Sequence, residues 1–276
     1  MKFTKMHGLG NDYIFVNCFE ENVKEPEALA KKMSARHFGV GSDGLVLIMP
    51  SEKADFRMRI FNPDGSEAEM CGNAVRCVAK YVRDRNMIDA DEFEIETLAG
   101  IIKPKVISSG RVSMVRVDMG EPVLERKKIP MAGSDGKVID DVLDAGGTEV
   151  KITCVSMGNP HCVIFVESVD FPEFGHLGKI IENHDLFPNR INVEFVNVLN
   201  EHEIEMRVWE RGVGESLACG TGACAVAVAC VLNKKAGRDV TVHLKGGDLK
   251  ILWDEKTNHV YMTGSAETVY EGEWNE

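Results

Sequence analysis

Met70-Cys71-Gly72-Asn73-Ala74-Val75 is one of two segments in which cysteine and glycine introduce an apolar run, and Ala218-Cys219-Gly220-Thr221-Gly222-Ala223 is the other. The two cysteines are 148 residues apart (219 − 71 = 148). The same offset relates Gly10-Asn11 to Gly158-Asn159, Glu67 to Glu215, and the pair Val112 and Met114 to Val260 and Met262. Because four matches share one offset and one order, we expect two related halves, at about residues 3–118 and 151–266.

Each half has the same succession of local patterns around its cysteine. Residues 55–60 and 203–208 alternate apolar and polar side chains, which predicts a strand in each half. A polar turn containing glycine follows each strand, and a helix is expected after each cysteine. The second helix, residues 223–232, is apolar on nearly every face, which predicts burial on all sides.

These patterns predict an α+β fold that is internally duplicated. Each of two pseudo-symmetric domains is expected to be a strongly curved β-sheet around one central helix, with the active site in the cleft between the domains. The predicted limits are 1–118 plus 266–276 for the N-terminal half and 119–265 for the C-terminal half, with a linker at 119–122. The last segment, 266–274, is expected to return and complete the first sheet.

Composition limits the classes of function. Hydrophobic residues make up 44% and charged residues 28%, which is typical of a globular chain. The net charge of −12 argues against a nucleic-acid partner. No apolar run is long enough for a membrane span, and residues 1–10 lack the apolar core of a signal peptide, so we expect a cytoplasmic protein with a small-molecule substrate.

The eight cysteines are expected to be reduced, and none is spaced C-x-x-C, which argues against a zinc or iron–sulfur site. Six of them lie in expected helices or strand-like runs and are interpreted as packing residues, namely Cys18, Cys77, Cys154, Cys162, Cys224 and Cys230. Cys71 and Cys219 differ because each lies at a turn-to-helix junction and precedes a glycine.

A helix start offers unpaired N–H groups and a partial positive charge, which favour a thiolate, lower the pKa of a cysteine and bind a carboxylate. Inversion at an α-carbon needs one group to remove a proton and a second to deliver one to the opposite face. Two facing thiols, one ionised, do this and exchange roles for the reverse reaction. The duplicated cysteines therefore indicate a cofactor-independent amino-acid epimerase with Cys71 and Cys219 as the acid/base pair.

Polar residues near the predicted turns suit a zwitterionic substrate. The amides of Asn11, Asn62, Asn159 and Asn192 offer both donors and acceptors. Arg211 is suited to a second carboxylate, and Glu210 to an ammonium group.

At these residues the sequence resembles the diaminopimelate epimerases over nearly the whole chain. The resemblance is carried by His7-Gly8-Leu9-Gly10-Asn11-Asp12-Tyr13, Phe61-Asn62-Pro63-Asp64-Gly65-Ser66, Glu69-Met70-Cys71-Gly72-Asn73-Ala74-Val75-Arg76, Met157-Gly158-Asn159-Pro160-His161, Trp209-Glu210-Arg211-Gly212 and Ala218-Cys219-Gly220-Thr221-Gly222-Ala223.

The resemblance implies interconversion of LL- and meso-diaminopimelate, in lysine and peptidoglycan precursor synthesis, without pyridoxal phosphate or metal. It implies the Cys71–Cys219 acid/base pair, and it implies substrate contacts by Asn11, Asn62, Asn159, Asn192, Glu210 and Arg211. It further implies that the backbone N–H groups at Gly72, Asn73, Gly220 and Thr221 hold the reacting carboxylate. His161 and Glu210 are implied to tune the thiols, and Tyr270 to lie at a homodimer contact.

Two positions depart from the pattern of some family members. Where they have a glutamine contact this chain has Gly44, so that contact is missing or made by Asp43 or by backbone. Where they have serine this chain has Thr221, and a backbone contact should survive the change.

Four other interpretations remain open. A cysteine-pair racemase acting on proline or hydroxyproline is the nearest, although Arg211 and the asparagines favour a substrate with a second charged end. An isomerase with a carboxylate base is disfavoured because both cysteines are present. A phosphate- or pyridoxal-phosphate-binding protein would use Gly220-Thr221-Gly222, and a redox or metal-binding module would use Cys71 and Cys219.

Overall fold

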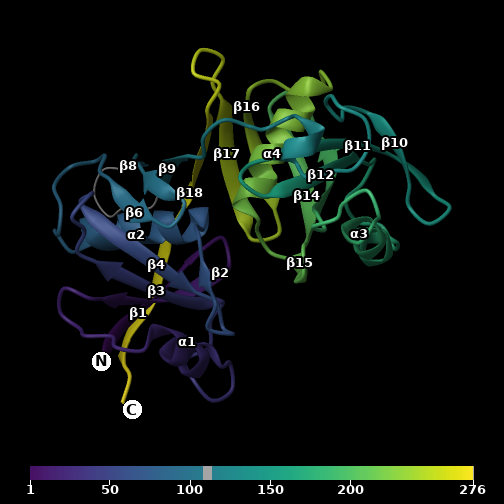
Figure 1. Ribbon diagram of the computed structural model, residues 1–276. Helices are drawn as coiled ribbons and strands as arrows, with labels where there is room; N and C mark the ends of the chain where they lie inside the picture. The colour runs from purple at the N-terminus through teal and green to yellow at the C-terminus, as the bar shows by residue number, and fades with distance from the viewer. Residues whose placement is uncertain (108–113, 276) are drawn as a thin grey trace. The chain divides into compact units, whose positions relative to one another are not determined.

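The computed structural model describes residues 1–107 and 114–275, so Val112 of the repeat lies outside the described residues. The chain divides into two compact units. The first comprises Met1–Asp118 and Thr263–Glu276, and the second comprises Met119–Met262 (Figure 1).

The first unit is a sheet with two helices. Its strands are β1 (Lys2–Gly8), β2 (Asn11–Asn17), β3 (Gly44–Met49), β4 (Phe56–Phe61), β5 (Glu67–Ala68), β6 (Ile95–Thr97), β7 (Gly100–Ile102), β8 (Pro104–Val106), β9 (Met114–Asp118) and β19 (Glu267–Glu273), and its helices are α1 (Pro26–Ser34) and α2 (Gly72–Asp84). The sheet order is β19-β1-β2-β3-β4-β6-β7, with β5 paired to β4. Strands β8 and β9 pair antiparallel with each other.

The second unit repeats this plan. Its strands are β10 (Asp141–Asp144), β11 (Glu149–Ser156), β12 (Pro160–Phe165), β13 (Asn192–Val198), β14 (Glu203–Glu210), β15 (Gly214–Ser216), β16 (Asp239–Leu244), β17 (Gly247–Trp253) and β18 (Val260–Ser265), and its helices are η1 (Arg126–Lys128), α3 (Phe174–Glu182) and α4 (Gly220–Leu232). The sheet order runs β10-β11-β12-β13-β14-β16-β17-β18, with β15 paired to β14. Strand β18 carries the chain back to the first unit.

The duplication is confirmed residue by residue, because the offset of 148 holds for both helix pairs. Helix α1 starts at Pro26 and α3 at Phe174, while α2 starts at Gly72 and α4 at Gly220. Strand registers obey the same offset. Tyr13 on β2 pairs in parallel with Gly44 on β3, and His161 on β12 pairs in parallel with Asn192 on β13. The α+β class and the pseudo-symmetric halves are therefore as the sequence predicted.

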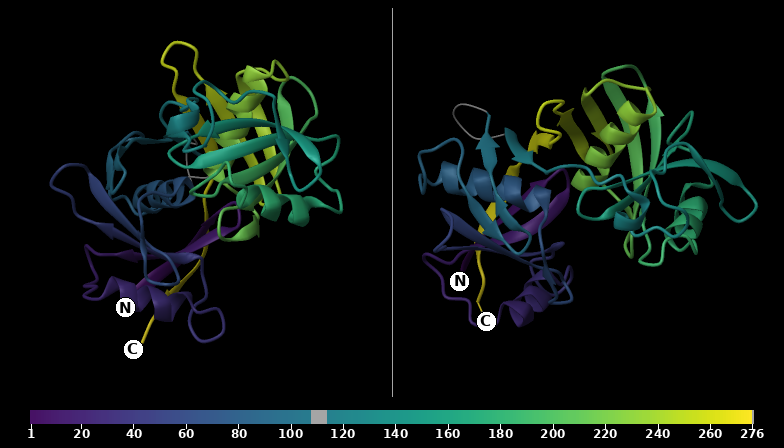
Figure 2. Two further views of the ribbon diagram at one scale, coloured as in Figure 1. Left: turned by 45° about the vertical axis from the view of Figure 1, so that its right-hand side comes forward. Right: turned by 45° about the horizontal axis from the view of Figure 1, so that its top comes forward.

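One helix forms the core of each unit. Helix α2 packs against β1, β8, β9 and β19, and α4 packs against β11, β12, β13, β16 and β17 (Figure 2). The expectation that the second helix is buried on all sides is confirmed, since every residue from Gly222 to Cys230 is buried. Helix α2 is equally buried but contains polar residues, among them the fully buried Arg76.

The opposite face of each sheet is covered by a second, shorter helix. Leu29 and Met33 of α1 join the apolar cluster that contains Leu45 and Leu47 of β3. In the second unit Phe174 and Ile181 of α3 join the cluster that contains Phe195. Because side chains alternate along a strand, the residues between these positions point to the side of the central helix.

The C-terminal segment completes the first sheet, as expected. Strand β19 pairs antiparallel with β1, and the amino group of Met1 donates to the Trp274 carbonyl at 2.8 Å. Within the described residues, none of the helices is both long and apolar enough to span a membrane.

Candidate active site

Cys71 lies at the N-cap of α2, immediately after the turn that follows β5. Its backbone is extended (φ −144°, ψ 117°), and its side chain is half-buried. The helix therefore begins at Gly72, as the sequence predicted, and the thiol stands beside the first turn of the helix.

The Cys71 thiol is held in a hydrogen-bond network within the first unit. Its sulfur lies 3.5 Å from Asn11 Oδ1, to which the thiol donates, and the Tyr13 hydroxyl donates to it at 3.6 Å. Asn11 Oδ1 also accepts from Asn73 Nδ2 at 3.1 Å, and Asn11 Nδ2 donates to Asp43 Oδ2 at 2.9 Å. Three residues predicted for the site, Asn11, Cys71 and Asn73, are thus brought together.

Arg76 anchors this network from inside the core. Its side chain is 0% exposed, and its guanidinium donates to Asn73 Oδ1 at 2.8 Å and to the Ser265 carbonyl at 3.1 Å. A buried arginine is uncommon unless it is paired or hydrogen-bonded. Sequence reasoning did not assign Arg76 to the site, although it lies in the segment that carries the family resemblance.

Gly44 has no space for a side chain. A Cβ atom there would lie 2.4 Å from the Phe61 carbonyl oxygen and 3.0 Å from the ring of Tyr13. A glutamine at this position is therefore incompatible with the backbone observed here. Asp43 accepts from Asn11, so its carboxylate supports a predicted substrate residue.

Asn62 begins the turn after β4. Its Nδ2 donates to Ser66 Oγ at 3.0 Å, and its backbone N–H donates to the Ser66 carbonyl at 2.8 Å. These bonds give Asn62 a structural role in the turn, and its predicted contact with a substrate stays a prediction.

Cys219 is the N-cap of α4 and is buried, with 7% of its surface exposed. Its sulfur accepts from the Gly222 N–H at 3.4 Å and lies 3.5 Å from Thr221 Oγ1. These two contacts lower the pKa of Cys219, but burial and then the negative charges of Glu210 and Glu194 raise it well above its ordinary value. The N–H of the helix start lowers the pKa of Cys219 as expected, but loss of water outweighs it, so the expected net shift towards a thiolate is wrong for Cys219.

A buried chain of three polar side chains lies beside Cys219. His161 Nδ1 is 2.7 Å from Glu194 Oε1, and His161 Nε2 is 3.0 Å from Asn159 Oδ1. His161 and Glu194 are both 0% exposed. A ring held between a carboxylate and an amide is fixed in orientation, so two predicted residues, Asn159 and His161, are brought together.

Glu194 is a residue of this site that sequence reasoning missed. The signal was a lone glutamate within the apolar strand β13, where an unpaired charge is costly. A Cβ atom on Gly222 would lie 2.8 Å from Glu194 Oε1, so glycine in the first turn of α4 leaves space for the carboxylate. The other oxygen, Oε2, is buried without a hydrogen-bond partner among the described residues.

Asn192 supports the turn that carries Glu210 and Arg211. Its Nδ2 donates to the Pro160 carbonyl at 2.9 Å, and its Oδ1 accepts from the Arg211 backbone N–H at 2.9 Å. The Arg211 guanidinium donates to the Asn189 carbonyl at 3.0 Å, and Glu210 accepts from the Ser216 hydroxyl. Asn192 thus connects β12 to the end of β14.

The described residues contain one group of side chains with metal-ligating potential. Donor atoms of His161, Glu194 and Cys219 lie within 4.8 Å of one another. Imidazole, carboxylate and thiolate are all zinc ligands. The His161 and Glu194 atoms are already hydrogen-bonded to each other, so a metal ion would have to replace that bond.

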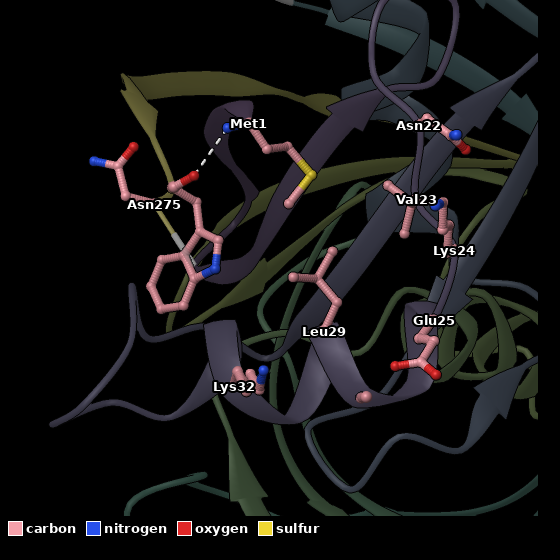
Figure 3. Close-up of a pocket in the computed structure, with 10 residues that line it drawn as sticks. Met1, Asn22, Val23, Lys24, Glu25, Leu29, Lys32 and Asn275 are labelled. Atoms are coloured by element: carbon pink, nitrogen blue, oxygen red, sulfur yellow. Dashed lines mark hydrogen bonds between the residues drawn. The ribbon is translucent and has the colours of Figure 1, made fainter.

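The remaining cysteines and Tyr270 complete the positions that the sequence singled out. Each of the eight cysteines is a free thiol, and those inside the helices, Cys77, Cys224 and Cys230, are buried. Tyr270 is 44% exposed on β19, where its ring meets Phe3 edge-on. A cavity of about 700 Å³ near α1 is lined by Met1, Leu29, Trp274 and neighbouring residues (Figure 3), none of which was predicted for the site.

Known proteins resemble this chain along almost its full length. The family model described as diaminopimelate epimerase matches residues 3–125 and 153–269. The protein named diaminopimelate epimerase of Pelotomaculum thermopropionicum is 61% identical over 99% of both chains. The protein of that name from Acetivibrio thermocellus is 59% identical over 99% of this chain and 98% of its own.

Solved structures share the fold at much lower identity. A Bacillus anthracis phenazine biosynthesis protein of the PhzF family matches with a TM-score of 0.71 at 17% identity, covering 100% of this chain and 99% of that chain. A probable proline racemase from Agrobacterium radiobacter matches with a TM-score of 0.71 at 15% identity, covering 99% and 92%.

Proposed function

Because the chain belongs to the diaminopimelate epimerase family, we propose that it interconverts LL- and meso-diaminopimelate by moving one proton at an α-carbon. The observation that carries this proposal is the pair of cysteines at equivalent N-caps, of α2 and of α4. In this role the chain is an isomerase that serves the synthesis of lysine and of peptidoglycan precursors.

The proton transfer uses both sulfurs, and the substrate loses one proton and gains one. The Cys71 thiolate takes the α-proton and becomes a thiol, and the electron pair of the C–H bond stays on the substrate as a carbanion. Cys219 then gives its proton to the opposite face of that carbon and becomes the thiolate. The reverse reaction exchanges the two roles.

The charge state of Cys219 supports its part as the proton donor. Burial and the carboxylates of Glu210 and Glu194 raise the pKa of this thiol well above its ordinary value, so it holds its proton in the free protein. The carbanion needs positive charge or N–H donors beside the substrate carboxylate. We assign this to the backbone N–H groups of Gly72 and Asn73 in α2 and of Gly220 and Thr221 in α4.

The other polar residues are assigned to the rest of the substrate. Asn11, Asn62, Asn159 and Asn192 present amides, Arg211 takes the distal carboxylate and Glu210 an ammonium group. His161 and Glu210 set the protonation of the thiols. The contacts of Asn159 with His161 and of Asn192 with Arg211 support a preorganised binding surface in the second unit.

The experiment is exchange of solvent deuterium into the α-carbon of LL-diaminopimelate, with wild type, Cys71→Ala and Cys219→Ala. We expect exchange and epimerisation in the wild type and a loss of about 1,000-fold or more in each variant, because each removes one of two obligatory proton carriers. Full activity in either variant would exclude the two-thiol mechanism. Assays with proline and hydroxyproline separate the racemase alternative.

A metal-binding module is the second candidate, favoured by the grouping of His161, Glu194 and Cys219. Metal analysis of the purified protein separates it from the epimerase. One equivalent of zinc that is lost in Cys219→Ala would favour the metal site, whereas epimerase activity in metal-free protein favours the thiol pair.

We also propose a homodimer in the cytoplasm. Strand β19 is at the edge of the first sheet and exposes Val269 and Tyr270 (54% and 44%), which supports a contact there. Sedimentation of the wild-type protein tests the dimer, and a monomer at assay concentration would refute it.

A further inference from the structure

Tyr13 stands in the first half where His161 stands in the second. The two residues are 148 positions apart, and each is on the strand that follows a Gly-Asn loop. Their registers also correspond, since Tyr13 pairs with Gly44 and His161 pairs with Asn192, which are again 148 positions apart. The repeat therefore gives each half one ring at the same place relative to its cysteine.

Both rings lie close to the sulfur of their own half. The Tyr13 hydroxyl is 3.6 Å from Cys71 Sγ, within hydrogen-bond distance for sulfur. In the second half, ligand atoms of His161 and Cys219 lie within 4.8 Å of each other. Of the two, Tyr13 makes the direct contact with its cysteine.

Gly44 makes this position of the tyrosine possible. A Cβ atom on residue 44 would come within 3.0 Å of Tyr13 Cε1 and 3.2 Å of Cδ1, so the ring covers the glycine. In the second half the equivalent residue, Asn192, keeps its side chain. The space that a side chain at position 44 would occupy is therefore used by a phenol that reaches Cys71.

We propose that Tyr13 is a catalytic residue of the first half, whose hydroxyl donates a hydrogen bond to the Cys71 sulfur and favours its thiolate. The proposal rests on the epimerase function, because it assigns a partner to one of the two reacting sulfurs. Hydrogen bonds from a neutral donor to an anion are among the stronger ones in proteins.

Tyr13 is suited to donate and not to exchange its proton. Burial, the negative charge of an ionised Cys71 and its hydrogen bond, and then Asp43, raise the Tyr13 pKa well above its ordinary value. The hydroxyl therefore keeps its proton throughout the reaction. When Cys71 takes the α-proton the hydrogen bond weakens, and it strengthens again when the thiolate returns.

Three further groups belong to the hydrogen-bond network around Cys71. Asn11 accepts from the thiol, Asp43 lies behind Asn11, and Arg76 lies behind Asn73. Replacing the Tyr13 hydroxyl leaves these groups in place and removes only its own hydrogen bonds, to Cys71 and to Asn11.

The test is the pH dependence of Cys71 alkylation by iodoacetamide in the full chain, quantified from the Cys71 peptide by mass spectrometry. In Tyr13→Phe the ring still covers Gly44 but the donor is lost. We expect the midpoint of the alkylation profile to move up by about one pH unit, which is about tenfold less thiolate at neutral pH. Tyr261→Phe, on β18, is the matched control and should leave the profile unchanged.

A midpoint that stays in place or moves down in Tyr13→Phe overturns the proposal. A second measurement covers a variant that does not fold. In wild-type protein labelled with ¹³C at the tyrosine Cζ, one of the four tyrosine resonances should shift when Cys71 ionises, and this shift should be absent in Cys71→Ala. A spectrum without such a shift contradicts the contact.

Activity is read separately. Tyr13→Phe should lower kcat/KM for α-proton exchange on diaminopimelate by about tenfold. The alkylation and resonance experiments need no substrate, so they decide the role of Tyr13 even if the wild-type protein fails to act on diaminopimelate.

Discussion

The two halves place Cys71 and Cys219 at the same point of the same fold but bury side chains of opposite charge in the core nearby. The network around Cys71 contains the buried cation Arg76, and the equivalent residue of the second half is Cys224. The polar side chains beside Cys219 include the buried anion Glu194, and the equivalent residue of the first half is Val46. Duplication preserved the backbone positions of the two thiols, while the core residues around them diverged.

This difference in charge corresponds to a difference in hydrogen bonding. Cys71 is half-buried and has a hydroxyl and an amide as neighbours. Cys219 is buried near two carboxylates, which add to burial in raising its pKa. The mechanism we propose needs one thiolate and one thiol, and such asymmetry favours one distribution of the proton before substrate binds.

The largest expected effect comes from placing the charge of the second half in the first. In Val46→Glu a carboxylate would replace a fully buried side chain. The equivalent carboxylate of the second half is paired with His161, whereas the first half has Tyr13 at that position. We expect the free energy of unfolding to fall by about 3–5 kcal/mol, because an unpaired charge is buried. Urea unfolding measures this, with Val46→Leu as the apolar control. A loss below about 1 kcal/mol would show that the first half accommodates a carboxylate.

The next effect removes the charge from the second half. Glu194→Gln keeps the shape of the side chain and the possibility of a bond to His161 Nδ1, but removes a negative charge that raises the Cys219 pKa. We expect kcat/KM to fall by about 100-fold, because His161 loses its charged partner. The midpoint of Cys219 alkylation should move to lower pH.

The exposed Glu203→Gln, on β14, is the matched control for Glu194→Gln and should change neither quantity. A higher midpoint for Cys219 in Glu194→Gln would indicate that its charge acts on the thiol chiefly through a charged His161.

The smallest effect, taken for one thiol and one pH unit, concerns buried cysteines in the two central helices. Burial raises the pKa of Cys77 in α2 and of Cys230 in α4 from an ordinary value of about 9 to about 12. Below pH 9 both thiols are protonated in the folded and the unfolded chain. Above pH 9 only the unfolded chain releases the protons, so stability falls by about 1.4 kcal/mol per pH unit for each thiol until pH 12.

Urea unfolding at several values between pH 8 and pH 11 measures this loss. The two thiols contribute equally to the slope of unfolding free energy against pH. Each of the substitutions Cys77→Ala and Cys230→Ala should therefore remove about half of that contribution, after correction for the cavity that it leaves. If only one substitution changes the slope, the two helices are not equivalent in burial.

Much of the architecture could be predicted because it depends on local patterns. Alternation at 55–60 and 203–208 predicted strands β4 and β14, and the apolar run after Cys219 predicted the buried helix α4. The role of Glu194 could not be predicted in this way. Its partner His161 is 33 residues away, and the two meet only because β12 and β13 lie parallel and adjacent.

The amino-acid sequence by itself determined the duplication, the α+β class and the two cysteines at helix starts, because repeat spacing and side-chain periodicity are properties of the chain. The tertiary structure alone decided which groups surround each sulfur. Parallel pairing of β2 with β3 lays the ring of Tyr13 over Gly44, and burial raises the pKa of Cys219 against the effect of its own helix start. Loss of water and contacts between distant strands have no local signature, so they exist only once the chain has folded.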